Sequence, residues 1–136
     1  MAARLLLASA SPRRRELLAR AGVVFTSAAA EIDESVGAGE CARDYVSRVA
    51  RAKARALAAL HADTWILAAD TTVVIDGEVV GKPADALAAR HMLARLRGRT
   101  HQVLTYVCLR APDGQEHEVF ATTDVTLRAA SETELD

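Results

Sequence analysis

The sequence predicts one mixed α/β domain, and three observations lead to this fold class. Short apolar runs typical of buried strands alternate with amphipathic segments typical of helices. The pair Asp76-Gly77 lies between two β-branched runs, which predicts a hairpin. Two longer strand-like runs follow around a Pro112-Asp113-Gly114 turn. The predicted order, β-α-β-α-β-hairpin-α-β-β, indicates a mixed sheet with flanking helices.

The first part of the chain predicts a strand, a helix and a second strand. Residues 5–8 are a short apolar run, and Ser11 and Pro12 are suited to the N-cap and the first helical position. The apolar stripe of this helix and its glycine stop are formed by Leu17, Leu18, Ala21 and Gly22. Residues 23–25 are then predicted to form the second strand, followed by an acidic loop.

The middle of the chain predicts a long helix over about residues 40–61 and a buried strand over 65–69 that ends at Asp70. Lys53 falls on the apolar line of that helix, which is formed by Ala42, Val46, Val49, Leu57 and Leu60. A hairpin of residues 72–75 and 78–80 follows. Asp85 is predicted to cap a third helix that ends at Gly98 and carries Leu87, Met92, Leu93 and Leu96. The last strands are predicted at 103–109 and 118–127.

Length and charge limit the classes of protein to which this chain can belong. The chain has 136 residues, enough for a single domain over 1–136, and 17 basic against 18 acidic residues give a net charge of −1. This balance argues against a nucleic-acid coat or a membrane-surface protein, while a small anionic ligand needs only a local cluster. No apolar run approaches the roughly 20 residues of a membrane span, and residues 1–8 resemble a buried strand more than a signal peptide. We therefore expect a cytoplasmic protein.

Cysteines and histidines are predicted to be structural. Cys41 and Cys108 lie far apart and outside any C-x-x-C pattern, so we expect two buried, reduced thiols. The spacing of the four histidines does not match a zinc site, and surface or structural roles are expected for His61, His91, His101 and His117. The sequence has neither a G-x-G-x-x-G nor a Walker-type motif.

Three arginines in one helical turn are the first sign of a ligand. A helix N-terminus carries partial positive charge and free N–H donors, yet Arg13, Arg14 and Arg15 add further positive charge there. A bound phosphate would make this arrangement favourable. The alternative is that the arginines are solvated or pair with acids such as Glu16.

Four further residues have two interpretations each. Lys53 either extends its ammonium to solvent or faces a cavity that holds negative charge. Asp70, at a predicted strand end, is either a turn residue or part of a ligand site. Glu34 is solvated unless a metal gathers it with Asp70, and Lys82 is either an exposed loop residue or a ligand contact.

Five blocks occur in one order over nearly the whole chain: LASASPRRRELL, EIDES, YVSRVARAKA, ILAADTTVVIDGEVVGKP and RTHQVLT. This pattern resembles the Maf family of nucleoside triphosphate pyrophosphatases, whose fold is Maf/ITPase-like. The combination of S-x-S-P-R-R with A-A-D-T and G-K-P is highly specific. The resemblance implies hydrolysis of a nucleoside triphosphate to the monophosphate and pyrophosphate with Mg²⁺ or Mn²⁺, and a homodimer. It also implies links to cell-division arrest and to the clearing of noncanonical nucleotides.

The resemblance also implies roles by matching position. Asp70 corresponds to the proton acceptor that activates water, and the metal-side carboxylates are Glu34 and Asp70. The residues that line the triphosphate are Ser9, Ser11, Arg13, Lys53 and Lys82. Members of the 7-methyl-GTP type carry an aromatic residue at position 13 and D-Q at 70–71, so this chain resembles the dTTP/UTP type. Arg14 and Thr71 are then the implied specificity positions.

The end of the sequence predicts a helix that is not completed. Ser131-Glu132-Thr133-Glu134 is a capping box, and the chain stops two residues later. Either the protein is truncated or this is a frayed polar tail. The resemblance implies a further C-terminal segment, similar to G-A-Y-G-I-Q-G, that contributes to the pocket. The alternatives to an enzyme are a non-catalytic nucleotide-binding remnant or regulator, and a phosphate-binding module outside this family.

Overall fold

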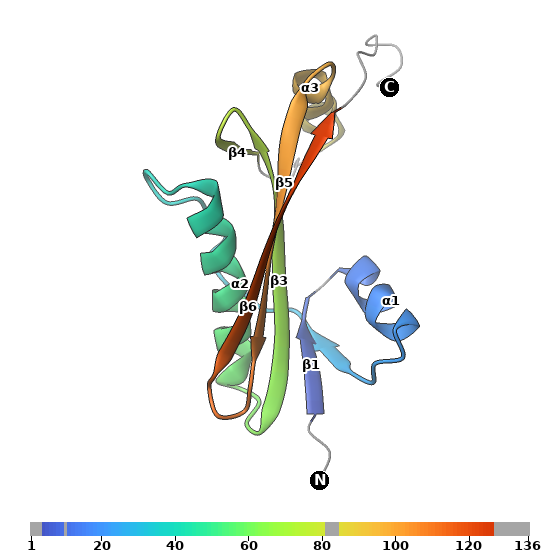
Figure 1. Cartoon of the computed structure of the whole chain (residues 1–136), viewed down its shortest axis with the longest axis vertical. Helices are drawn as coiled ribbons and strands as arrows, with labels where there is room; N and C mark the ends of the chain where they lie inside the picture. Colours follow the sequence, from blue (N-terminus) through green and yellow to red (C-terminus); the bar gives the residue numbers. More distant parts are fainter. Residues whose placement is uncertain (1–3, 10, 81–84, 127–136) are drawn as a thin grey trace.

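The computed structural model describes residues 4–9, 11–80 and 85–126, which form a mixed sheet flanked by helices (Figure 1). The elements are β1 (Arg4–Ala8), α1 (Pro12–Arg20), β2 (Thr26–Ala28), α2 (Ala42–Ala58), β3 (Thr64–Ile75), β4 (Glu78–Val80), α3 (Ala86–Leu96), β5 (Thr100–Arg110) and β6 (Glu116–Thr126). The sheet order is β2-β1-β3-β5-β6, with β4 paired to β3. The predicted fold class and element order are confirmed. Lys82 and the capping box at Ser131 lie outside the described residues.

Strand β3 is the longest element of the sheet and defines its layout. On one edge it pairs antiparallel with β5, from Ile66 opposite Arg110 to Val74 opposite Gln102. On the other edge β1 pairs in parallel as far as Ala68, and β4 pairs over residues 73–75. Residues 69–72 therefore have no strand partner on that second edge. The prediction that a strand ends at Asp70 is wrong, because the continuous pairing with β5 keeps this polar stretch extended.

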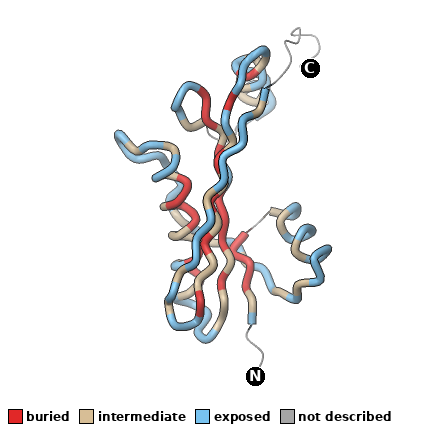
Figure 2. Tube along the Cα trace, in the orientation of Figure 1, coloured by how far each residue is buried: buried red, intermediate tan, exposed pale blue. Residues whose placement is uncertain are grey.

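The core lies between α2 and one face of the sheet, where the buried residues of α2, β1, β3 and β5 meet (Figure 2). The helix contributes Val46, Ala50, Ala54 and Leu57 to this cluster. It is shorter than the predicted 40–61, and Leu60, placed on its apolar line, is 77% exposed. The helix ends earlier because the chain reverses towards β3, with Asp63 in the left-handed region at φ 54°.

Helix α1 differs from the others because none of its residues is buried (Figure 2). Ser11 caps it as predicted, with its Oγ accepting from the Arg14 N–H at 3.4 Å. The predicted apolar stripe of this helix is not buried, since Leu17 is 49% exposed. The strand predicted at 23–25 lies at Thr26–Ala28 instead, and Val24 is 92% exposed. Residues 23–25 are needed to bring the chain from the helix end back to the register of β1.

The remaining elements follow the predictions more closely. Asp76 and Gly77 have φ values of 51° and 79°, as a tight hairpin turn requires, and β4 pairs back on β3. The Asp85 carboxylate accepts from the Ala88 N–H at 2.8 Å and caps α3. Leu87 of that helix is exposed and Leu96 is buried. The two final strands exist but are longer than predicted. Within the described residues, every helix is too short or too polar to cross a bilayer.

One cysteine prediction is wrong. Cys108 is buried and free, and burial raises the pKa of its thiol to about 11. Cys41 is also free but exposed, because it occupies the extended N-cap position before α2 rather than a core-facing turn. Among the histidines, His101 is buried and the other three are exposed.

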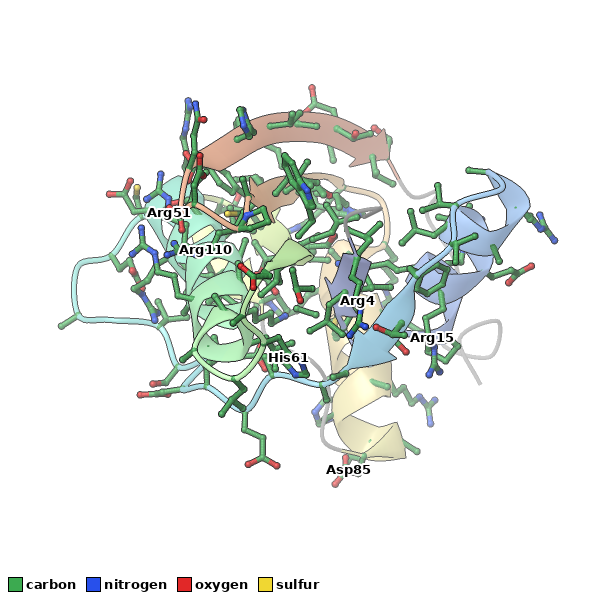
Figure 3. All side chains as sticks on the ribbon, turned by 90° about the horizontal axis from the view of Figure 1, so that it is seen from below. Arg4, Arg15, Arg51, His61, Asp85 and Arg110 are labelled. Carbon is green, nitrogen blue, oxygen red and sulfur yellow. The ribbon has the colours of Figure 1, made fainter. Side chains whose placement is uncertain are left out.

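Ion pairs join α2 to β6, and Figure 3 labels two of the arginines involved, Arg51 of α2 and Arg110 of β5. Arg51 pairs with both carboxylate oxygens of Glu118 and also donates to the Tyr106 hydroxyl at 3.0 Å. One turn later, Arg55 makes a two-point pair with Glu116 at 2.8 and 3.0 Å, and Arg110 also binds Glu116. We call these residues the arginine clamp. Its hydrogen bonds, above all that from Arg51, lower the pKa of Glu118 to about 2.

We expect the arginine clamp to make stability depend on pH. The pKa of Glu118 is lower in the folded than in the unfolded chain, so its contribution is complete above about pH 4.5 and is lost as pH falls towards 2. Glu118→Gln should lower the free energy of unfolding by about 1 kcal/mol at pH 7, because solvent screens this partly exposed pair. The difference between the two proteins should shrink below pH 4 in denaturant titrations. Glu78→Gln, at an exposed pair with Arg95, is the control and should change little.

Candidate active site

The gap in the edge of β3 at residues 69–72 is where four segments converge. Chain leaving β1 carries Ser9 and Ser11 directly past the gap, and α1 begins at the next residue. The loop after β2 brings Glu34, and α2 brings Lys53. In α/β sheets, small molecules bind beyond the carboxyl ends of the parallel strands. This gap lies at such a position.

Glu34, Lys53 and Asp70 form an ionic trio at this gap. The Lys53 ammonium lies 3.2 Å from a Glu34 oxygen and 3.4 Å from an Asp70 oxygen. The Lys53 side chain is only 15% exposed, so the ammonium faces the carboxylates instead of extending to bulk solvent. Asp70 is buried within β3, which excludes the interpretation of a turn residue. The structure thus brings three predicted site residues together.

Burial controls the basicity of Asp70. Loss of solvent raises the pKa of its carboxyl above the usual range, and the Lys53 ammonium offsets only part of this effect. The nearby Glu34 carboxylate raises the pKa further by like-charge repulsion. A carboxylate with a raised pKa is a stronger base, which suits a group that must take a proton from water.

The loop that carries Glu34 is held by two α2 side chains that the sequence analysis did not single out. The Tyr45 hydroxyl donates to the Glu34 carbonyl oxygen at 2.6 Å. Arg48 donates to the Ser35 carbonyl at 2.7 Å and binds Glu40 through Nε and Nη2 at 2.8 and 3.0 Å. Tyr45 lies about two turns before Lys53, and that spacing was the available signal.

Ser9 and Ser11 have hydroxyls oriented by the backbone around them. The Ser9 Oγ accepts from the Ser11 N–H at 3.0 Å, and the Ser11 Oγ accepts from the Arg14 N–H. Each hydroxyl accepts through a lone pair and keeps its own proton for another acceptor. Both therefore can donate to an anionic oxygen in the cavity that they line.

Two cavities meet at the ionic trio. The first, of about 420 Å³, is polar, and its lining includes Ser9, Ser11, Arg14, Glu34 and Lys53. The second, of about 460 Å³, is mostly apolar, with a lining that includes Glu34, Tyr45, Asp70, Val73, Val80 and Met92. Glu34 lines both. A ligand with one charged and one apolar part would place its junction at the trio.

Among the three arginines, the structure connects Arg14 to the gap. Its Nη1 donates to the Ala69 carbonyl at 3.2 Å, and its Nη2 donates to the Thr71 hydroxyl at 3.1 Å. The two positions implied to set specificity are thus in direct contact. Arg13 and Arg15 are exposed, and neither is among the described residues that line the two cavities.

Two groups of carboxylates could attract a metal ion, and they differ in what already binds them. Glu34 and Asp70 both face the Lys53 ammonium, so their oxygens converge on a point that favours a cation. Oxygen donors of this kind suit Mg²⁺ and Mn²⁺. Glu116, Glu118 and Cys108 also have ligand atoms within 4.8 Å of one another. The clamp arginines bind both carboxylate oxygens of Glu116 and of Glu118, whereas Lys53 contacts only one oxygen each of Glu34 and Asp70, so the trio is the better candidate.

Comparison with known proteins shows to which family the chain belongs. Residues 4–136 match the protein-family model described as Maf-like protein. This chain belongs to the Maf family. It is similar to the dTTP/UTP pyrophosphatase of Myxococcus xanthus, with 53% identity over 96% of this chain and 66% of that relative. A dTTP/UTP pyrophosphatase of Anaeromyxobacter dehalogenans strain 2CP-1 is 50% identical, over all of this chain and 70% of the relative. The Maf chain thus spans about two thirds of the length of these relatives.

Solved structures support the fold of this Maf chain. A nucleoside-triphosphatase, dITP/XTP pyrophosphatase, from Mycobacterium abscessus matches with a TM-score of 0.65 and 20% identity, over 90% of this chain and 73% of that one. The Ham1 protein of Staphylococcus aureus matches with a TM-score of 0.62 and 16% identity, over 89% and 70%. At this identity the likeness concerns the fold, which confirms the predicted ITPase-like architecture.

We expect Lys53→Met to raise the pKa of Asp70 further. The substitution removes the positive charge that partly offsets burial, while Glu34 remains nearby. The carboxyl carbon of Asp70, followed by NMR during a pH titration, should titrate at higher pH than in the parent. Arg55→Met removes a cation from the same helix but from the arginine clamp. It should leave the titration of Asp70 in place, and an equal shift in both variants would contradict the local effect.

Proposed function

We propose that this chain hydrolyses a nucleoside triphosphate to the monophosphate and pyrophosphate, with dTTP and UTP as preferred substrates. The observation that carries the proposal is the ionic trio, which places a buried carboxylate and a lysine between a polar and an apolar cavity. The substrate preference follows from the printed names of the relatives, which are about half identical to this chain.

In this proposal the triphosphate occupies the polar cavity. Lys53 supplies positive charge to the phosphate oxygens, and the hydroxyls of Ser9 and Ser11 donate hydrogen bonds to them. Arg13 and Lys82 are the further phosphate contacts that the family resemblance implies. Fixed donors and charges of this kind stabilise the negative charge that develops as pyrophosphate leaves.

Asp70 is the proposed proton acceptor. Its raised pKa and its position beside Lys53 suit a carboxylate that takes a proton from the water attacking the phosphate. Glu34 and Asp70 are the side chains that would hold a divalent metal, since their oxygens already converge on a cation. Such an ion would neutralise phosphate charge. Tyr45 keeps Glu34 in place through its hydrogen bond to the Glu34 carbonyl.

We expect Asp70→Asn to abolish turnover and keep nucleotide binding. The amide retains the size of the carboxylate but is no longer a base, so pyrophosphate release should fall by at least about a hundredfold. The assay is release of pyrophosphate from a panel of nucleoside triphosphates with Mg²⁺ or Mn²⁺, together with equilibrium binding of UTP. Asp124→Asn, at an exposed position on β6, is the matched control and should stay active.

The outcomes separate an enzyme from a non-catalytic nucleotide-binding protein. A parent protein that releases pyrophosphate and loses this activity with Asp70→Asn supports the enzyme. A folded parent that binds UTP without turnover supports a nucleotide-binding regulator instead. An Asp70→Asn variant as active as the parent would show that another group accepts the proton.

A further inference from the structure

Thr71 is not isolated beside Arg14, because a second threonine lies behind it. Thr71 and Thr105 are directly opposite each other on the antiparallel strands β3 and β5. Their hydroxyl oxygens are 3.1 Å apart, which is hydrogen-bonding distance. Side chains alternate along a strand, so this pair lies on the opposite face of the sheet from Asp70. The chain of contacts runs from Arg14 through Thr71 to Thr105.

Burial indicates which hydroxyl donates in this pair. Thr105 is half-buried, and its hydrogen bond within the described residues is to Thr71. Thr71 is exposed, so its own proton can reach water or a ligand. The less accessible hydroxyl has fewer alternative acceptors, and leaving its proton unpaired would cost more. The favoured arrangement is therefore donation from Thr105 to Thr71.

As a consequence, the hydroxyl of Thr71 can only donate a hydrogen bond to a ligand. A hydroxyl oxygen has two lone pairs, and here one accepts from the Arg14 N–H and the other from Thr105. The remaining proton of Thr71 points away from both. Arg14 uses two of its five N–H groups on Ala69 and Thr71, and a guanidinium has no acceptor atom. Both residues therefore offer donors alone to a ligand.

We infer that Thr105 is a positioning residue that fixes Thr71 as a donor, so that Thr71, which lines the apolar cavity, selects a 4-keto pyrimidine nucleotide over a 4-amino one. This inference rests on the proposed function and deepens it. Uracil and thymine have an oxygen acceptor at position 4, whereas cytosine has an amino group whose N–H would meet further N–H and O–H donors. Once a bound base excludes water from these donors, an analogue that leaves them unpaired binds less well.

The test compares UTP with CTP in two matched threonine variants. Thr105→Val keeps the shape of the side chain and removes the hydroxyl, so Thr71 is free to accept as well as to donate. We expect the ratio of kcat/KM for UTP to that for CTP to fall by about fivefold, as expected for one hydrogen bond. Thr105→Ser keeps the hydroxyl and should preserve the ratio. Thr100→Val removes a similar pair, Thr100–Thr126, with oxygens 2.7 Å apart on β5 and β6, and should also preserve it.

Binding of UTP and CTP to the same proteins in the Asp70→Asn background separates this inference from the proposed hydrolysis. If UTP binds more tightly than CTP and Thr105→Val alone reduces that preference, the inference holds even without turnover. An unchanged preference in Thr105→Val would overturn it while leaving the hydrolysis intact. An equal loss in Thr100→Val would overturn it as well, since the effect would then be a general loosening of β5. A parent that binds the two nucleotides equally would also overturn it.

Discussion

The antiparallel pairing of β3 with β5 is the constraint on which the site depends. It keeps β3 extended through Asp70, Thr71 and Thr72, whose polar side chains would otherwise favour a turn. On the opposite edge β1 has already ended and β4 has not begun. Backbone groups in this interval need other partners, and the Arg14 bond to the Ala69 carbonyl is one of them. A paired edge on one side and an open edge on the other therefore produce a rigid strand with an accessible middle.

Helix α2 connects the core, the sheet and the site. Its apolar face packs on β3 and β5, the arginine clamp fixes its rotation against β6, and Lys53 and Tyr45 reach the site. Because all three contacts arise from one helix, the position of the Lys53 ammonium is set by packing and by ion pairs at a distance. Two carboxylates share one ammonium and one of them is buried, so the charge balance of the site depends on this single placement.

The sequence allowed much of this to be predicted, and the failures have physical causes. Capping at Ser11 and Asp85 and the Asp76-Gly77 turn depend on neighbouring residues, and each is confirmed. The position of β2 and the continuity of β3 depend on pairing with distant strands, which local pattern does not contain. The exposure of Leu17 could not be foreseen, because an apolar stripe shows that a helix can bury a face, not what covers it. The role of Thr105 could not be predicted for the same reason, because the role of a threonine in a strand depends on the residue opposite it on the neighbouring strand.

Because α1 packs loosely, Arg14 has a second role, which is to hold this helix to the sheet. The helix buries none of its residues, and within the described chain its side-chain hydrogen bonds to the sheet are those from Arg14 to Ala69 and Thr71. Those donors face the open edge of β3 and also line the polar cavity. A ligand that draws the guanidinium towards itself thus competes with the anchorage of the helix. Ligand binding in the polar cavity and the orientation of α1 are therefore coupled through the Arg14 side chain.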